Sequence, residues 1–267
     1  MMVNDDFTEA LSLRWNQTCV GKGFMQVENS ALRMGCSLAE VGDYTNAQID
    51  DYGQRKRVDF PWHPPLRMEV RARSSHAAAT AGDSGDSTDS LRGTAGFGFW
   101  NYPFSVRGDV LMLPEAVWFF YASPPSNMAL VPHLPGWGWK AQVIHSMRLD
   151  ALAAVAPMAL SAAWARLTGE TRPAQRWMQR LSGASEALLS APMQDWHTYV
   201  IEWLPEAATF RVDDQLVLRA PQPPRGPLGF VAWLDNQYAI ATARGTLRFG
   251  TVASGPEWIE LDYVKIR

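Results

Sequence analysis

Short apolar or alternating runs, separated by turn-forming residues, make up most of the 267-residue chain. The clearest run is 66–73, in which Leu66, Met68, Val70 and Ala72 alternate with charged residues. A period of two is typical of a β-strand with one buried face, because successive side chains point to opposite sides of the strand. Many such runs at regular spacing predict an all-β sandwich or jelly roll.

Two aromatic runs, 96–101 and 113–121, are apolar enough to be central strands of a sheet. Glycines alternate with aromatic residues in the first run, which predicts room for a ligand to approach the sheet face closely. Further strands are expected at 11–15, 24–27, 31–34, 44–50, 136–145, 196–203, 208–212, 216–218, 228–236 and 258–266.

Two segments interrupt this series of strands. Residues 74–93 are mostly Ser, Ala, Gly, Asp and Thr, and we expect a mobile surface loop there. In 149–192 apolar residues recur at helical spacing, with Leu181 and Leu188 assigned to a second helix. This pattern predicts a helical insertion packed outside the sandwich, with a lid over the ligand as the alternative. Because strand patterns resume after each segment, we expect one domain over 1–267.

The composition excludes several classes of protein. Hydrophobic residues are 47% and charged residues 19% of the chain, which supports a large core and excludes global disorder. The net charge of −3 and the scattered basic residues argue against a nucleic-acid or membrane partner. The N-terminus lacks the pattern of a signal peptide, so we expect a cytoplasmic location. Cys19 and Cys36 lack metal-type spacing and are expected to be buried free thiols.

The order of motifs resembles that of glycoside hydrolase family 16, the laminarinase-type glucanases of the concanavalin A-like lectin/glucanase superfamily. The motifs in the C-terminal third are the strand 196–203, the hairpin 210–217, the Pro-rich bend before Ala232-Trp233-Leu234, and the terminal run 261–266. Upstream, 66–73 resembles the E-x-R strand of that family, and 98–100 resembles its aromatic strand before the catalytic one. The resemblance implies a concanavalin-like β-sandwich jelly roll and a carbohydrate ligand.

The catalytic motif of that family, E-x-D-x-x-E, is degenerate in this chain. Glu115 matches the family's nucleophile, whereas Val117 and Phe120 replace the Asp and the acid/base Glu. Retaining hydrolysis needs two carboxyl groups about 5–5.5 Å apart, so Glu115 alone cannot support it. No acidic residue follows on this strand, and a second carboxyl group would have to come from Asp235 or, less favourably, Glu202.

Other candidate site residues lie at strand ends and in the aromatic runs. With Glu115 and Asp235, the resemblance implies His197 as a third catalytic candidate, and a structural histidine is the alternative. Aromatic faces suit the C–H patch of a pyranose, and polar groups at strand ends orient ligands. The candidate ligand-binding residues are Trp100, Asn101, Trp118, Tyr121, Trp233, Asn236 and Tyr238.

The resemblance also implies a structural calcium ion near Asp6 and Asp262, and no other cofactor. Two carboxylates do not define such a site, because calcium takes six to eight oxygen ligands. The metal ligands are therefore unknown at this stage.

Three functions are open at this stage. The first is a carbohydrate-binding, glucanase-like jelly roll whose hydrolytic machinery is lost or rebuilt, that is, a pseudoenzyme. The second is an intracellular enzyme or binder acting on a small hydrophobic molecule, because Val117 and Phe120 make the expected groove less polar. The third is an active β-glucan hydrolase that uses Glu115 with Asp235.

Overall fold

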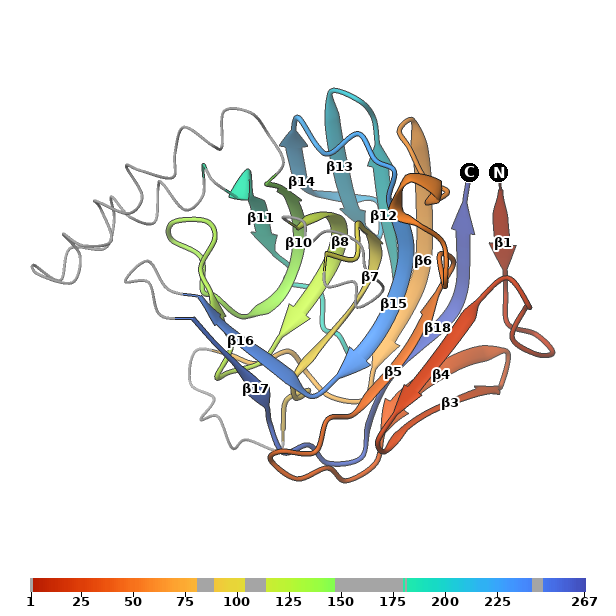
Figure 1. Ribbon diagram of the computed structural model, residues 1–267, viewed down its shortest axis with the longest axis vertical. Coiled ribbons are helices and arrows are strands. Elements are labelled where there is room, and N and C mark those ends of the chain that lie inside the picture. The colour runs from red at the N-terminus through yellow and green to blue at the C-terminus, as the bar shows by residue number, and fades with distance from the viewer. Residues whose placement is uncertain (1, 81–88, 104–113, 147–179, 181, 242–246) are drawn as a thin grey trace, which may run out of the picture.

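A computed structural model describes residues 2–80, 89–103, 114–146, 180, 182–241 and 247–267, and it confirms the predicted all-β sandwich. Two large antiparallel sheets are stacked on each other (Figure 1). The eight-stranded sheet has the order β14-β13-β12-β6-β18-β4-β3, with β1 beside β18. Its strands are β1 (Val3–Asp5), β3 (Gly23–Glu28), β4 (Ala31–Cys36), β6 (Leu66–Ser74), β12 (His197–Trp203), β13 (Ala207–Val212), β14 (Gln215–Pro221) and β18 (Glu257–Ile266).

The second sheet has seven strands in the order β11-β10-β8-β7-β15-β5-β2. They are β2 (Asn16–Val20), β5 (Asn46–Asp50), β7 (Thr94–Trp100), β8 (Glu115–Ala122), β10 (Gly138–His145), β11 (Ser185–Leu188) and β15 (Gly229–Asp235). A third, three-stranded sheet contains β9 (Asn127–Met128), β16 (Gln237–Ala241) and β17 (Leu247–Thr251). A short 3₁₀ helix, η1 (Arg57–Asp59), follows β5.

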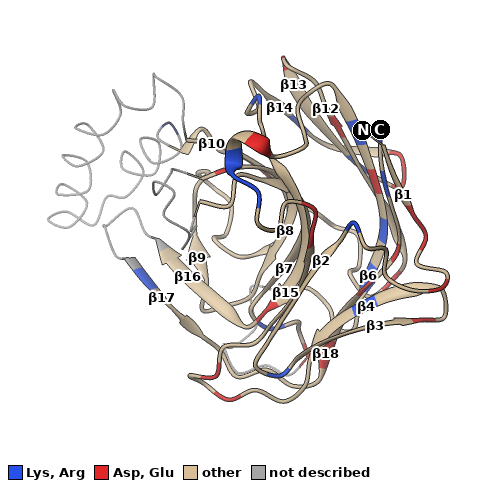
Figure 2. Ribbon diagram, turned by 45° about the vertical axis from the view of Figure 1, so that its right-hand side comes forward, with Lys and Arg blue, Asp and Glu red and all other residues tan. Residues whose placement is uncertain are grey.

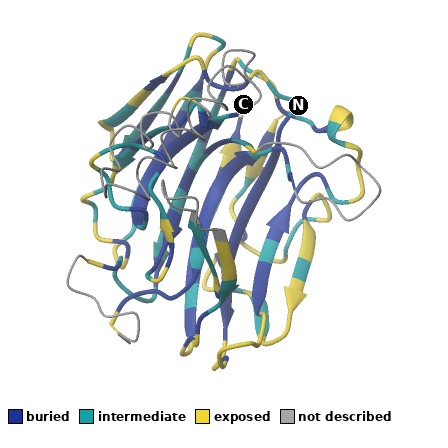
Figure 3. Ribbon diagram, turned by 60° about the vertical axis from the view of Figure 1, so that its left-hand side comes forward, coloured by how far each residue is buried: buried dark blue, intermediate teal, exposed yellow. Residues whose placement is uncertain are grey.

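The two large sheets enclose one hydrophobic core. The alternation in 66–73 has the predicted effect, since Met68, Val70 and Ala72 are buried between the sheets and the residues between them are half-buried. From the seven-stranded sheet, Phe97 and Phe119 pack into the same core. Figure 3 shows this burial, in dark blue, along the central strands. The core therefore uses alternate residues of β7 and β8 and leaves the residues between them for the opposite face.

Several predicted elements differ from the structure. Residues 11–15 are not a strand but a turn, with the Trp15 N–H donating to the Ser12 carbonyl oxygen. Residues 185–188, predicted as part of the second helix, form β11 and pair with β10. Most of the rest of the predicted insertion, 149–179 and 181, lies outside the described residues.

The predicted surface loop 74–93 is held together at its base. Ala77 and Ser90 form a parallel bridge, and the Leu91 N–H donates to the Ala77 carbonyl oxygen at 3.0 Å. Leu91 is fully buried in the core. The middle of this segment, 81–88, lies outside the described residues.

The outer face of the eight-stranded sheet is charged. Arg33 and Arg73 both bind the carboxylate of Glu260, at 2.6 and 2.7 Å. Figure 2 shows charged residues on β4 and β6, whereas β7 carries none and β8 only Glu115. Among the described residues, no helix has the length and apolar character needed to cross a membrane. The two cysteines are both free, but the prediction that both are buried is wrong, because Cys19 is exposed.

Candidate functional site

Aromatic side chains cover the face of the seven-stranded sheet that is turned away from the eight-stranded sheet. Strand alternation places Trp100 of β7, Trp118 and Phe120 of β8, and Trp233 of β15 on this face. Tyr52, Phe60 and Tyr102 join them from the segments that follow β5 and β7. We call these seven residues the aromatic face. The aromatic face confirms that the aromatic runs 96–101 and 113–121 form one surface of this sheet.

The rings of the aromatic face are in continuous contact. The ring centroid of Trp118 lies 5.8 Å from that of Trp100, 5.3 Å from Phe120 and 5.1 Å from Trp233. The ring of Tyr52 stacks on Phe60 at 4.7 Å. These separations lie in the range of favourable aromatic pairs. Trp100, Trp118 and Phe120 are only half-buried, so parts of their rings face outward.

The sequence predicted that the glycines of β7 leave space for a ligand, and this prediction is wrong. The glycines make room for the aromatic rings of neighbouring strands. A Cβ on Gly96 would lie 2.9 Å from the Trp233 indole, and a Cβ on Gly98 would lie 2.6 Å from Trp118 Cα. Gly98 also has φ of +145°, which disfavours any other residue. The space that the glycines leave is thus filled by indoles from neighbouring strands.

A buried polar network borders the aromatic face on β10 and β11. The Trp118 indole N–H donates to Gln142 Oε1 at 2.6 Å, and the Gln142 amide donates to Glu186. Lys140 Nζ lies 3.0 Å from the other oxygen of Glu186 and 2.6 Å from the Pro135 carbonyl oxygen. Sequence analysis missed these residues. The available signal was the spacing of two between Lys140 and Gln142 in an otherwise apolar strand, which places both polar side chains on one face. Glu186 gave no such signal, because it lies in the segment predicted to be helical.

Polar residues of β5 border the aromatic face on its other side. Asn46, Gln48 and Asp50 lie opposite Asp235, Trp233 and Val231 of β15. Gln48 donates to Asp50 at 3.0 Å, while the buried Oδ1 of Asn46 has no hydrogen-bond partner among the described residues. An unpaired buried amide oxygen is costly unless a ligand or water satisfies it.

Glu115 is not part of the aromatic face. It points to the same side of β8 as Val117 and Phe119, which belong to the core between the sheets. Its Oε1 lies 3.4 Å from Nε2 of His145, whose Nδ1 is 3.0 Å from the Gln222 carbonyl oxygen next to β14. Burial raises the pKa of Glu115 to about 7. The structure therefore does not bring the catalytic candidate Glu115 together with the predicted ligand-binding residues Trp100, Trp118 and Trp233, because strand parity directs it to the opposite side.

Asp235 lies on the aromatic side but far from Glu115. Asp235 pairs with Thr94 at one end of β7, whereas Glu115 lies beyond Trp100 at the other end. Along a strand this separation is roughly 20 Å, well beyond the spacing of any glycosidase pair. Asp235 accepts from the Thr94 hydroxyl at 2.8 Å, and burial raises its pKa to about 6. Glu202, the other candidate, is in the eight-stranded sheet, where it binds Arg67.

His197 belongs to the eight-stranded sheet and does not reach the aromatic face. It starts β12, opposite Ala72, and its Nδ1 lies 2.5 Å from Oδ2 of Asp213. Its Nε2 is buried and has no partner among the described residues. This position fits the alternative of a structural histidine, because its hydrogen bond to Asp213 holds the turn between β13 and β14.

The remaining polar candidates hold the fold together. Tyr121 is fully buried, donates to the Leu91 carbonyl oxygen at 2.6 Å and anchors the base of the 74–93 loop. Asn101 accepts from the Glu115 N–H at 3.1 Å, which extends the β7–β8 pairing. Asn236 is fully buried and binds Thr45, Asp43 and Val252. Tyr238 is half-buried on β16, with its ring against Gly250.

The carboxylates suggested for calcium are engaged elsewhere. Asp262 binds Arg71 at 2.7 Å, and Asp6 accepts from the Thr8 hydroxyl at 3.1 Å. Within the described ranges, no group of three or more His, Cys, Asp or Glu side chains is placed to hold a metal ion. These residues do not fit the six to eight oxygen ligands of calcium.

Comparison with known proteins identifies the fold. No family model and no curated protein matches the chain. A laminarinase from Rhodothermus marinus is similar in structure, with 14% identity, a TM-score of 0.53, and coverage of 99% of this chain and 95% of that one. An apo Crh5 transglycosylase matches with 13% identity, a TM-score of 0.52, and coverage of 100% and 83%.

A third similar structure is an endo-β-galactosidase from Clostridium perfringens that releases GlcNAcα1-4Gal, with 12% identity and a TM-score of 0.53. The match covers 99% of this chain but only 61% of that one. Identities this low show the fold and not the reaction. The chain thus has the β-sandwich jelly-roll fold of the glycoside hydrolase family 16 type, as its motif order implied.

Proposed function

We propose that this protein binds a glycan on its aromatic face and does not hydrolyse it. One observation carries this proposal. On the face where β8 meets Trp100 and Trp233, the strand presents Ala116, Trp118 and Phe120 and no carboxyl group.

The composition of the aromatic face suits a sugar. The half-exposed rings of Trp100, Trp118 and Phe120 offer flat apolar surfaces for the C–H faces of pyranose rings. The border on β5 is polar, with the half-buried Gln48 and with Asn46, whose Oδ1 has no partner among the described residues, whereas Gln142 on the other border already binds Trp118 and Glu186. Such groups hydrogen-bond sugar hydroxyls and fix the orientation of the ligand. The structurally similar laminarinase makes β-glucan oligosaccharides the first ligands to test.

The carboxyl groups on this side of the sheet are poorly placed for glycoside hydrolysis. Among the described residues of the seven strands they are Asp50, Glu186 and Asp235. Glu186 is buried against Lys140, at the far edge of the sheet from β5. Asp50 and Asp235 lie opposite Val231 and Asn46, roughly 13 Å apart along the strands, whereas hydrolases need about 5–9.5 Å.

Isothermal titration calorimetry with laminarin oligosaccharides tests the proposal. We expect saturable binding to the wild type and at least about tenfold weaker binding to Trp118→Ala and to Trp100→Ala, because each loses a stacking surface. The matched control is Trp196→Ala, whose indole packs under Arg71 and Arg73 and is remote from the aromatic face. Circular dichroism checks that each variant is folded.

Other outcomes would contradict the proposal. Release of reducing sugar by the wild type would mean an active hydrolase. Absence of heat with every glycan, together with saturable binding of a hydrophobic fluorescent probe that Trp118→Ala abolishes, would favour the alternative of a small hydrophobic ligand. Equal loss of glycan binding in Trp196→Ala would place the glycan elsewhere.

A further inference from the structure

The indole N–H groups of the aromatic face all donate to side chains from neighbouring strands or turns. Trp118 donates to Gln142 Oε1 at 2.6 Å, Trp100 to the Tyr52 hydroxyl at 2.8 Å, and Trp233 to the Thr94 hydroxyl at 2.9 Å. An indole has a single N–H donor and no acceptor. A ligand on the aromatic face therefore meets the faces of these rings and not their donors.

The partner of Trp118 is held in one orientation by an ion pair. Gln142 is buried on β10, opposite Trp118 in the β8–β10 pairing. Its amide donates to Glu186, whose carboxylate lies 3.0 Å from Lys140 Nζ. A carboxylate accepts hydrogen bonds and cannot donate them, so the amide nitrogen of Gln142 faces Glu186. The amide oxygen is thereby turned toward Trp118 and accepts from its indole.

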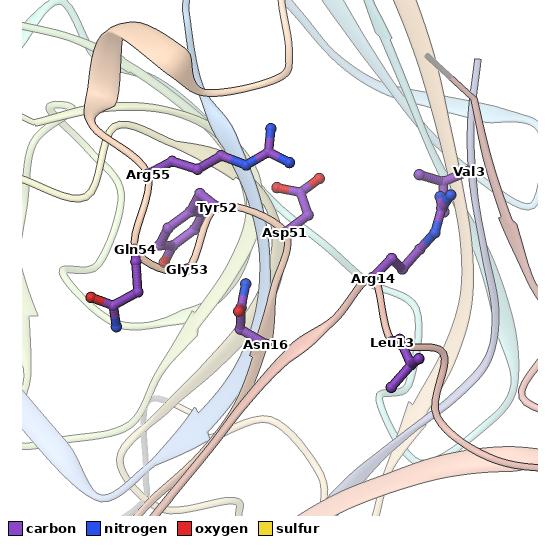
Figure 4. A pocket seen from close by; sticks show the side chains of 9 residues that line it. All are labelled: Val3, Leu13, Arg14, Asn16, Asp51, Tyr52, Gly53, Gln54 and Arg55. Atoms are coloured by element: carbon purple, nitrogen blue, oxygen red, sulfur yellow. The ribbon is translucent and has the colours of Figure 1, made fainter.

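The partner of Trp100 comes from the turn after β5, on the other side of the aromatic face. The buried ring of Tyr52 lies over Gly229 of β15, where an added Cβ would collide with it. Figure 4 shows that this ring points away from the carboxylate of Asp51. The ring stacks on Phe60 at 4.7 Å, which fixes the hydroxyl group that accepts from Trp100.

We propose that Gln142 and Tyr52 are positioning residues for glycan binding. Each holds the indole of a half-exposed tryptophan, Trp118 or Trp100, in a single orientation. A flipped Trp118 indole would leave the buried oxygen of Gln142 without a donor, which is unfavourable. A ring surface that is fixed before the ligand arrives loses less side-chain entropy on binding. The inference rests on the proposed function, because the glycan is the ligand that these rings receive.

Two conservative variants, Tyr52→Phe and Gln142→Met, remove the acceptors and keep most of the side-chain volume. Each should weaken the binding of laminarin oligosaccharides by about three- to tenfold in isothermal titration, because the ring is no longer held. Tyr52→Phe should have little further effect in a Trp100→Phe background, and Gln142→Met little in a Trp118→Phe background. Phenylalanine has no N–H to hold, so these double variants separate the hydrogen bond from packing.

The indole N–H signals in heteronuclear NMR spectra give a second readout, which needs no glycan. The signals of Trp100 and Trp118 are identified by their absence in Trp100→Phe and Trp118→Phe. Tyr52→Phe should speed hydrogen exchange at the indole of Trp100 and leave that of Trp118 unchanged. Gln142→Met should have the reverse effect.

The matched control is Tyr199→Phe, which removes the hydroxyl that accepts from the Trp139 indole at 3.4 Å inside the core. It should bind glycan like the wild type, and circular dichroism confirms the fold of each variant. Wild-type affinity in Tyr52→Phe and Gln142→Met, or unchanged indole exchange in both, would overturn the inference and leave the proposed function standing. Losses as large in the double variants or in Tyr199→Phe would do the same. Absence of glycan binding by the wild type would overturn both.

Discussion

Glu115 and His145 face each other across the β8–β10 pair, with Oε1 of Glu115 3.4 Å from Nε2 of His145. Both point toward the eight-stranded sheet, where Gln222 binds the other ring nitrogen of His145. The residue that matches the family nucleophile in sequence therefore lies on the opposite side of β8 from Trp118. The register of β8 places Trp118 and Phe120, and not Glu115, on the aromatic face.

Glycan binding should therefore be independent of Glu115. We expect Glu115→Gln to bind laminarin oligosaccharides with the wild-type dissociation constant, because its side chain does not reach the aromatic face. Isothermal titration measures this. A substantially weaker affinity in a correctly folded Glu115→Gln would show that the carboxyl group contacts the ligand after all.

Stability should fall as the pH rises from about 4.5 to 8. Burial raises the pKa of Asp235 to about 6, of Asp51 and Glu115 to about 7, and of Glu257 to about 8. In this range the folded protein keeps protons that the unfolded chain has already released. The free energy of unfolding therefore decreases with pH until these groups ionise in the folded state. Urea denaturation between pH 5 and 8 measures the effect.

Glu115→Gln isolates the share of one group in this pH dependence. A neutral amide does not ionise, so the variant avoids the cost of a buried negative charge at high pH. Between pH 5 and 8 its free energy of unfolding should therefore decrease by about 1–2 kcal/mol less than that of the wild type, after allowance for solvent screening. Identical pH profiles for the two proteins would contradict this prediction, because Glu115 would then titrate alike in the folded and unfolded chains.

Removal of Lys140 should destabilise the fold strongly. Its ammonium group binds the fully buried carboxylate of Glu186 at 3.0 Å. Lys140→Met leaves that charge unpaired, with an expected loss of about 3–5 kcal/mol. The double variant Lys140→Met/Glu186→Gln should recover most of the loss, because the introduced amide is uncharged and its oxygen can still accept from Gln142. Urea denaturation of the three proteins tests this, and a double variant no better than the single one would contradict it.

Gly98 should tolerate no side chain. Its φ of +145° and the 2.6 Å approach of an added Cβ to Trp118 Cα both oppose alanine. We expect Gly98→Ala to lose about 1–3 kcal/mol of stability. The control is Gly255→Ala, where nothing lies within 4 Å of the added Cβ, and there the change should stay within about 0.5 kcal/mol. Similar melting temperatures for both variants would refute this reading of β7.

The sequence by itself determined which segments become the main strands and, where one face is polar, which face is buried. In 66–73 the alternation of apolar and charged residues leaves one orientation that hides Met68 and Val70. The order of such strands was enough to identify the jelly roll. The weak strands β1, β2 and β9 are short or polar, so they form only because a neighbouring strand is available for pairing.

Only the tertiary structure decided which side of β8 carries the site. Both faces of this strand are apolar, with Val117 and Phe119 on one and Trp118 and Phe120 on the other, so periodicity cannot tell core from surface. Periodicity also could not predict the distance between Glu115 and Asp235, because that distance depends on the register in which β8 and β15 pair with β7.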